Sequence, residues 1–464
     1  MSTRIAKPAA TPAGGITTST TAALPAAGTS GRLRRLTDGL RGIVVDSGIG
    51  WVNLGGAVVH AHDFLGYTSG TNETPALQAA IDSLVNLGGG RVLLGARDWR
   101  LETTLKVASG AAFNGVCLVG DSRQTTLLSW YGSTSGTAVL FNGSKNSPVA
   151  QDFQVINRVA RGTTIGMHFS RESGTGTQNS GNLCVEVSSS SFYTGWRFGD
   201  NANTRAASEI VLISCGAYTN TYGWVTEEAD TLDIMWLNPQ GGENGSAWSL
   251  GSGCFQIIGG SCSGSTVADI ECATYMLTVI GLRSEGANRY LKWVTTGNNT
   301  TLNLRDCLVT AGTNADGIMI EGGNTGTLRL DGCDIYGRIA VTPAAANARV
   351  TLKDTRVMDS QLIYPNQTGC VLDVLGNCRT ISSIGAPVSI IAPGRYVSSG
   401  TTLVPGFTWD STSPFLPVIA TASLPAAGAA NDGRCVIEDN GTGDRNLVFY
   451  AGGQRFRVDG GASI

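Results

Sequence analysis

A four-residue step recurs from about residue 205 onward and restricts the possible folds more than any other feature. It reads Leu-x-x-Cys in LISC (212–215), LRDC (304–307) and LDGC (330–333), and Leu-x-x-Thr in LKDT (352–355). Cys333 lies 26 residues after Cys307, and Thr355 lies 22 residues after Cys333. A repeat of roughly 20–26 residues is typical of a solenoid, in which each repeat packs only on its neighbours.

The residues between these steps favour strands over helices. Segments such as GWRFG (195–199), AWSLG (247–251) and GIMIEG (317–322) are short and are separated by Gly, Asn, Ser and Thr. Leucine-rich repeats share the period, but their Leu-x-x-Leu-x-Leu-x-x-Asn signature does not occur here. We therefore predict an all-β parallel β-helix, with equivalent positions stacked about 4.8 Å apart from one rung to the next.

One amphipathic helix is predicted in TPALQAAIDSLVNLGGG, residues 74–90. Thr74 suits the N-cap and Pro75 the first helical position, while Leu77, Ile81 and Leu84 recur at helical spacing. Three glycines then end the helix before a strand. The first rung of a β-helix exposes a strand edge and an apolar interior, so we expect this helix to cap it.

Composition excludes several classes of function. Only 14% of residues are charged, and the net charge of −3 with a pI near 5.7 argues against nucleic-acid or anionic-membrane binding.

No apolar run is long enough for membrane insertion, and no secretory signal is evident, which favours synthesis in a cytosol. The 11 cysteines form no C-x-x-C pair or zinc-like cluster, so no metal and no cofactor are expected.

Residues 63–130 resemble the N-terminal cap and first rungs of the pectate-lyase-like β-helix of bacteriophage tailspikes. The resemblance rests on Asp63-Phe64-Leu65-Gly66, the helix, the glycine run and Leu118-Val119-Gly120-Asp121. One residue is inserted in the first of these motifs. The resemblance implies a right-handed, single-stranded β-helix that forms a homotrimer. It also implies a protein that binds or cleaves a bacterial surface polysaccharide, either lipopolysaccharide or capsule.

This resemblance also implies a place in the virion. We expect a phage tail-tip protein, made in the host cytoplasm, whose N-terminal segment attaches to a tail or baseplate protein. TAALPAAG (21–28) recurs as TASLPAAG (421–428), which indicates a small β module at each end. The predicted domains are an attachment segment with a β module (1–57), the cap and first rungs (58–130), the glycan-binding β-helix (131–385), and a linker with a C-terminal trimerisation module (386–464).

Aromatic and acidic residues gather in TNTYGWVTEEADTLDIMWLNPQGGENGSAW, residues 219–248. Aromatic rings cover the apolar faces of sugars, and carboxylates accept hydrogen bonds from sugar hydroxyls. A solvated acidic turn is the alternative interpretation. Trp224 and Trp248 fall at equivalent positions with later aliphatic residues, which favours an interior stack over a sugar platform. The predicted glycan contacts are Tyr222, Glu228, Asp230, Trp236 and Glu243.

Strand alternation suggests a catalytic pair. If Trp224 and Ile270 point inward, Glu227 and Glu271 point outward. We expect these two glutamates to align in one column, roughly 9.6 Å apart across two rungs. Inverting glycosidases separate their carboxyls by about 6.5–9.5 Å. We predict Glu227 and Glu271 as acid and base, with Asp269 adjusting their geometry. Hydrolysis is mildly favoured over elimination, and non-catalytic adhesion on the same scaffold remains the main alternative; a secreted plant-polysaccharide enzyme is disfavoured.

Overall fold

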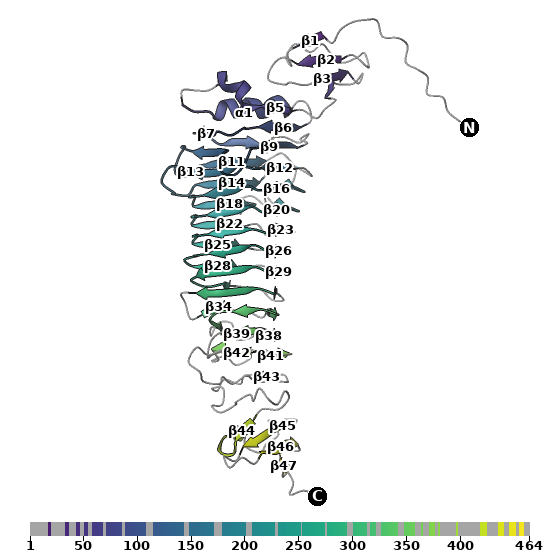
Figure 1. The fold of residues 1–464 in the computed structure, drawn as a ribbon, viewed down its shortest axis with the longest axis vertical. Coiled ribbons are helices and arrows are strands. Elements are labelled where there is room, and N and C mark those ends of the chain that lie inside the picture. The colour runs from purple at the N-terminus through teal and green to yellow at the C-terminus, as the bar shows by residue number, and fades with distance from the viewer. Residues whose placement is uncertain are drawn as a thin grey trace, which may run out of the picture. The chain divides into compact units, whose positions relative to one another are not determined.

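The structure of the chain is a computed structural model, shown in Figure 1. It describes residues 17–19, 33–36, 43–46, 51–53, 58–67, 71–85, 89–107, 115–142, 148–170, 179–200, 207–227, 231–251, 253–273, 276–294, 300–312, 316–321, 326–341, 348–357, 363–364, 371–375, 379–380, 396–397, 418–424, 435–439, 445–451 and 454–458. The chain divides into two compact units, Met1–Ser188 and Ser189–Ile464. This division does not test the domain boundaries predicted from the sequence, which stay predictions.

The first unit contains three parallel sheets through which the chain passes in turn. One holds β5 (Val58–His60), β6 (Gly90–Leu93), β9 (Val116–Val119), β12 (Pro148–Gln151) and β16 (Leu183–Val185). The second holds β7 (Asp98–Leu101), β10 (Leu127–Trp130) and β13 (Gln154–Asn157). The third holds β8 (Leu105–Val107), β11 (Thr137–Asn142) and β14 (Ile165–Ser170), and β15 (Asn179–Ser180) follows it.

The second unit repeats this plan in three sheets, here called X, Y and Z. Sheet X holds β20 (Val211–Ile213), β23 (Ile234–Leu237), β26 (Cys254–Ile258), β29 (Met276–Ile280), β32 (Thr301–Arg305), β35 (Thr327–Asp331), β38 (Arg349–Lys353) and β41 (Val371–Leu375), with β43 (Tyr396–Val397) antiparallel at its edge. Sheet Y holds β21 (Gly216–Tyr218), β24 (Gln240–Gly242), β27 (Ser261–Ser263), β30 (Arg283–Ala287), β33 (Leu308–Gly312), β36 (Asp334–Ile335), β39 (Arg356–Val357) and β42 (Arg379–Thr380).

Sheet Z completes each rung and carries the candidate site. It holds β18 (Thr194–Phe198), β22 (Tyr222–Thr226), β25 (Ser246–Leu250), β28 (Ala268–Cys272), β31 (Leu291–Val294), β34 (Asp316–Glu321), β37 (Arg338–Val341) and β40 (Ile363–Tyr364). Of two further short strands, β17 (Ser188–Ser190) includes the last residue of the first unit, and β19 (Ala207–Ser208) lies near the start of the second. The predicted parallel β-helix is confirmed.

The recurring Leu-x-x-Cys step has a direct structural cause. Leu304, Leu330 and Leu352 are in register on sheet X and point into the core. Two residues after each leucine, Asp306, Gly332 and Asp354 take positive φ angles of 51°, 65° and 48°, which turn the chain toward sheet Y. Gly, Asp and Asn tolerate this left-handed backbone best. The following Cys307, Cys333 and Thr355 are buried again.

Helix α1 (Thr74–Val85) lies across the end of the stacked strands in the first unit (Figure 1). Leu77, Ala80, Ile81 and Leu84 are buried, as a cap requires. It packs against the 3-10 helix η2 (Ala61–Tyr67) and nearby strands. No helix among the described residues is long and apolar enough to cross a membrane.

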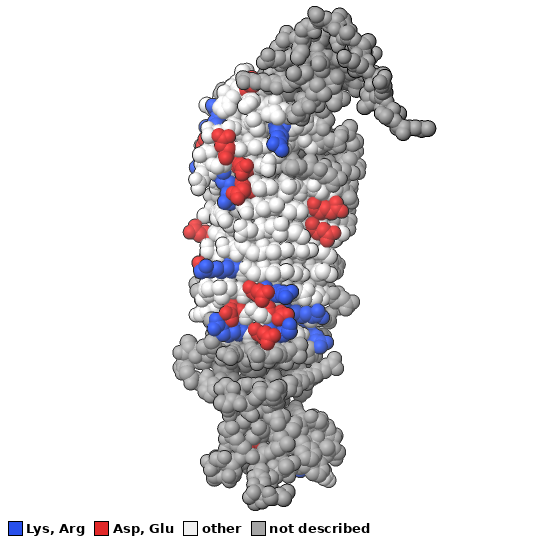
Figure 2. Space-filling model, turned by 45° about the vertical axis from the view of Figure 1, so that its right-hand side comes forward, with Lys and Arg blue, Asp and Glu red and all other residues white. Residues whose placement is uncertain are grey.

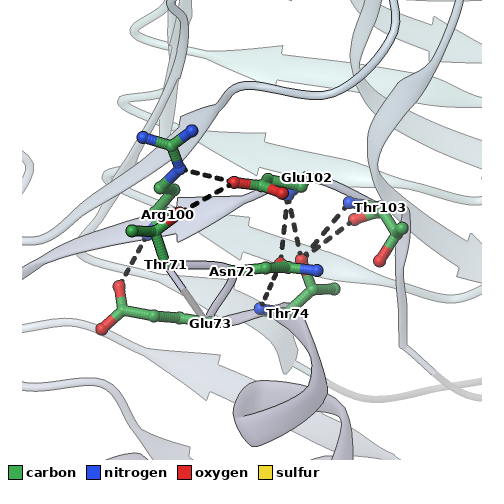
Figure 3. A network of polar contacts seen from close by, with 7 residues as sticks. All are labelled: Thr71, Asn72, Glu73, Thr74, Arg100, Glu102 and Thr103. Atoms are coloured by element: carbon green, nitrogen blue, oxygen red, sulfur yellow. Dashed lines mark hydrogen bonds and ion pairs between the residues drawn. The ribbon is translucent and has the colours of Figure 1, made fainter. Parts of the chain in front are cut away.

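Figure 3 shows how the start of α1 is joined to the strands. The Asn72 side chain, not Thr74, accepts the hydrogen bond of the first helical N–H, that of Thr74, at 3.0 Å. The Thr74 hydroxyl instead accepts the backbone N–H of Glu102 at 3.1 Å. The backbone N–H of Arg100 donates to Glu73 at 2.8 Å. The predicted helix is confirmed, but its N-cap role belongs to the residues before Thr74.

A small four-stranded sheet occurs near each end of the chain. The first contains β1 (Thr17–Ser19), β2 (Leu33–Leu36), β3 (Ile43–Asp46) and β4 (Trp51–Asn53); the second contains β44 (Val418–Ala420), β45 (Cys435–Asp439), β46 (Arg445–Ala451) and β47 (Gln454–Val458), with a short 3-10 helix (Thr421–Ser423) between β44 and β45. In both sheets the first pair of strands is parallel and the next two pairs are antiparallel. The duplicated module predicted from TAALPAAG and TASLPAAG therefore has one topology.

Candidate functional site

A groove of about 570 Å³ lies on the outer surface of sheet Z, near the carboxyl ends of β22, β25, β28, β31 and β34. These strands stack down the front of the ribbon in Figure 1. The groove walls include Tyr193, Tyr222, Glu227, Ser249, Glu271, Lys292 and Glu321. Both glutamates predicted as catalytic residues therefore border one groove.

Strand register builds the floor of this groove. Val225, Ser249, Glu271 and Lys292 follow one another in register on β22, β25, β28 and β31. Their neighbours Trp224, Trp248, Ile270 and Leu291 form the adjacent column and are fully buried. Because side chains alternate along a strand, the floor column points outward.

Glu227 lies just beyond the end of β22. Its backbone N–H donates to the Phe198 carbonyl at 3.3 Å, which keeps it on the rung pairing of sheet Z. Its carboxylate forms an ion pair with Arg197 of β18, and Arg197 also lies 3.7 Å from Asp200. The Arg197 and Glu227 side chains are both partly exposed, so this pair contributes little to stability but fixes the carboxylate.

Glu271 is held from both sides. The Ser246 hydroxyl donates to one carboxylate oxygen at 3.1 Å, and the Lys292 ammonium donates to the other at 3.0 Å. Lys292 also lies 3.8 Å from Glu321. The hydrogen bond to Glu271, together with the two nearby negative charges, raises the pKa of Lys292 against the effect of desolvation. Lys292 is therefore a firmly charged bridge between two glutamates.

Two tyrosines form one wall of the groove. Tyr193 and Tyr222 meet edge to face, with ring centroids 5.5 Å apart and planes at 77°. Burial raises the pKa of Tyr222, and Tyr193 and the negative charge of Glu271 raise it further. The Tyr222 phenol is therefore neutral near pH 7, and both tyrosines can offer an aromatic face and a hydroxyl to a sugar.

Tyr193, Arg197 and Lys292 were not predicted from the sequence as site residues. A signal for Tyr193 was available, because aligning the Gly-Trp pairs of YTGWRF and TYGWVT places Tyr193 one position from Tyr222. The alternation of strand side chains also places Arg197 outward, directly after buried Trp196. The same alternation places Lys292 outward between buried Leu291 and Trp293, but its partners, 21 and 29 residues away in the sequence, could not be identified from it.

The predicted alignment of the two glutamates was wrong by two residues. Glu271 is in register with Ser249 and, one rung further, with Val225 rather than Glu227. A two-residue offset along the strand and two rungs across it place their Cα atoms roughly 12 Å apart. Each carboxylate also binds a cation on the side away from the other, Arg197 on β18 and Lys292 on β31.

Asp269 does not point outward as predicted. Its side chain is fully buried, and the Ser284 hydroxyl of β30 donates a hydrogen bond to its carboxylate. Burial raises the pKa of Asp269 to about 6, although the Ser284 hydrogen bond opposes this shift. The residue is the second of β28, at the corner where the chain has passed from sheet Y to sheet Z, and the consecutive burial of Ala268, Asp269 and Ile270 breaks strict alternation. It does not line the groove.

The other predicted glycan contacts separate into three groups. Tyr222 borders the groove. Trp236 is fully buried in the column formed by Leu212, Trp236 and Ile257, so the prediction that it contacts a glycan was wrong. Glu243 is exposed in the turn after β24, with φ of 52°, and does not line the groove. Glu228 and Asp230 lie outside the described residues.

The aromatic column at Trp224 and Trp248 is confirmed as an interior stack, with ring centroids 4.6 Å apart and both residues fully buried. Among the described residues, no three His, Cys, Asp or Glu side chains lie close enough together to hold a metal ion. The groove thus offers carboxylates, one ammonium, hydroxyls and two tyrosine rings. Such a set can bind sugar hydroxyls and ring faces.

Comparison with known proteins places the fold. No protein-family model and no curated protein matches the sequence. The chain is similar to the solved tailspike gp42 of an Acinetobacter phage, with a TM-score of 0.54 and 10% identity over 92% of this chain and 81% of that one. It is also similar to the A-module of the Azotobacter vinelandii mannuronan C-5 epimerase AlgE4, with a TM-score of 0.50 and 14% identity over 73% of this chain and all of that one. The predicted resemblance to a β-helical tailspike is confirmed at the level of fold.

Proposed function

We propose that this chain is a phage tailspike or receptor-binding protein that recognises a bacterial surface polysaccharide through the groove on sheet Z. The observation that carries the proposal is the groove itself, where Tyr193 and Tyr222 face a row of hydrogen-bonding side chains on a rigid stack of strands. Polar groups on rigid strands bind a sugar chain with little loss of their own conformational freedom. The fold that the chain shares with a solved tailspike supports the same function.

Hydrolysis of the bound glycan is a second proposal, supported by the two glutamates that border one groove. Glu227 and Glu271 would act as acid and base once a bound sugar draws them from Arg197 and Lys292. The roughly 12 Å between their Cα atoms permits the carboxyl separation of an inverting enzyme only if the side chains turn toward each other. Adhesion without cleavage requires no such movement.

The test is a reducing-end assay on surface polysaccharide that the protein binds. If hydrolysis occurs, Glu227→Gln and Glu271→Gln should each lower turnover by about two to four orders of magnitude, with glycan affinity changed only several-fold. Glu285→Gln, at an exposed glutamate of β30, is the matched control and should keep full turnover. Bound glycan that releases no reducing ends would favour adhesion, and full turnover in both groove variants would exclude this pair.

We also propose that the protein is a homotrimer at the tail tip, attached to a tail or baseplate protein by its N-terminal segment. An apolar column on the outer face of sheet X supports self-association: Ile213, Leu237, Ile258 and Ile280 are in register on neighbouring strands and remain half-exposed. Further along the same column stand Arg305, Asp331 and Lys353. Figure 2 shows the corresponding contrast, with charged side chains gathered below a largely uncharged area.

A further inference from the structure

The groove is lined by more negative than positive side chains. The charged residues that line it are Glu227, Glu271, Glu321 and Lys292, which together carry a formal charge of −2. Arg197 and Asp200 lie beside Glu227 and cancel each other. Arg289 lies close enough to influence the pKa of Lys292 but does not line the groove.

Lys292 and Arg197 are already engaged by protein carboxylates. Lys292 lies 3.0 Å from Glu271 and 3.8 Å from Glu321. Arg197 contacts Glu227 and lies 3.7 Å from Asp200. To pair with either cation, the acidic group of a sugar would have to displace the protein carboxylate already bound there. The two negative groups would then remain side by side. Like charges at such distances repel strongly at a partly desolvated surface.

The remaining polar groups of the groove are neutral. Ser249 offers a hydroxyl, and Tyr193 and Tyr222 offer phenols with aromatic faces. The pKa of Tyr222 is raised first by burial and also by the negative charge of Glu271, as expected beside an excess of acidic groups. The hydroxyls and carboxylates of the groove can accept hydrogen bonds from the hydroxyl groups of a neutral sugar or from the ammonium group of an amino sugar.

We infer that the groove selects glycan segments without acidic groups, either neutral or amino-bearing, and rejects chains of uronic acid, sialic acid or sugar phosphate. This inference rests on the proposed glycan-binding function and narrows its substrate class. The net charge of −3 for the whole chain acts in the same direction during approach of a long polyanion.

The test uses an array of purified O-polysaccharides and capsular polysaccharides, neutral and acidic, probed with the full chain. Ser249→Trp places a large ring on the groove floor and should block binding there. A polysaccharide that binds the unmodified protein but not this variant therefore binds in the groove. Ser261→Trp is the matched control, because Ser261 is an exposed serine on β27 of sheet Y. We expect groove-dependent signals only on repeats that lack acidic groups.

A titration of the strongest neutral polysaccharide gives a second measurement. Its affinity should change less than about twofold between about 0.05 and about 0.5 M salt, since no net ionic contact is screened. Groove-dependent binding of acidic repeats would overturn the inference while leaving the glycan-binding function intact. Absence of any groove-dependent signal would instead contradict that function, and the inference with it.

Discussion

At the scale of single residues, position on a rung decides what an aromatic side chain does. Trp236 and Tyr222 come from one acidic and aromatic segment of the sequence, and both were expected to contact glycan. Trp236 occupies an inward position of β23 and packs edge to face against Phe198 and Phe255. Tyr222 begins β22 at the groove wall. One ring stabilises the fold, and the other is available to a ligand.

Two alanine substitutions should separate these roles. Trp236→Ala removes a fully buried ring and should cost about 3–5 kcal/mol of stability, seen as a lower thermal unfolding midpoint. Tyr222→Ala should leave that midpoint nearly unchanged and weaken glycan binding at least tenfold in calorimetric titration. An unchanged midpoint for Trp236→Ala, or undiminished binding by Tyr222→Ala, would reverse the assignment of these two residues.

Asp269 makes stability depend on pH in a direction opposite to that of an ordinary salt-bridged acid. Its pKa is raised from 3.8 to about 6, chiefly by burial, so the folded protein keeps this proton to a higher pH than the unfolded chain. The contribution of Asp269 to the free energy of unfolding therefore falls as pH rises from about 4 to about 6. At pH 7 ionisation of this carboxyl makes the free energy of unfolding about 3 kcal/mol lower than it would be with the carboxyl protonated.

Asp269→Asn should remove this pH dependence. The unfolding midpoint of the variant minus that of the unmodified protein should increase from pH 4 to pH 7, because Asn cannot ionise at this buried position. Asp354→Asn is the control, since Asp354 is exposed and Asn also tolerates its φ of 48°. A difference between Asp269→Asn and the unmodified protein that does not change with pH would show that the carboxyl does not titrate there.

At the scale of elements, each rung depends on a left-handed residue between sheets X and Y. Ser214, Asn238, Asp306 and Asp354 take this backbone conformation with φ near 50°, and Gly259, Gly281 and Gly332 take it with φ of 65–67°. Such a turn directs the next side chain inward, so the leucine and cysteine of the recurring step can both be buried. Glycine pays no steric penalty there, whereas a β-branched side chain does.

Asp306 offers a direct test of this turn. Asp306→Gly should change stability by less than about 1 kcal/mol, since Gly332 already occupies the equivalent place on the next rung. Asp306→Val should cost about 1–2 kcal/mol or more, because its Cβ branches crowd the left-handed backbone. Equal thermal unfolding midpoints for the two variants would mean that the turn adapts to either residue.

The same periodicity explains how far the sequence could predict the elements. A period of 20–26 residues and short strand-like segments were enough to predict a parallel β-helix, and the helical spacing of Leu77, Ile81 and Leu84 was enough to predict its capping helix. They could not fix the register, because strand side chains repeat every two residues and a slip of two leaves the pattern unchanged. Ile270 was therefore aligned with Thr226 instead of Trp248 and Trp224. Strict alternation also placed Asp269 outward, although it is buried with both of its neighbours.

At the scale of the whole molecule, the candidate site and the candidate assembly surface lie on different sheets. The groove occupies the outer face of sheet Z, and the apolar column of Ile213, Leu237, Ile258 and Ile280 occupies the outer face of sheet X. A trimer formed through sheet X would thus leave the groove residues of each copy available for glycan. It would also cover apolar side chains that a soluble monomer leaves half-exposed.

Light scattering can test this assembly. A trimer should have three times the chain mass of 48.1 kDa, about 144 kDa. The double variant Leu237→Asp with Ile258→Asp places two charges in the apolar column, and burying them unpaired would be costly, so its mass should move toward that of one chain. Ser261→Asp, at an exposed position on sheet Y, should keep the trimer mass. A monomeric unmodified protein would contradict the trimer, and a trimeric double variant would move its interface away from sheet X.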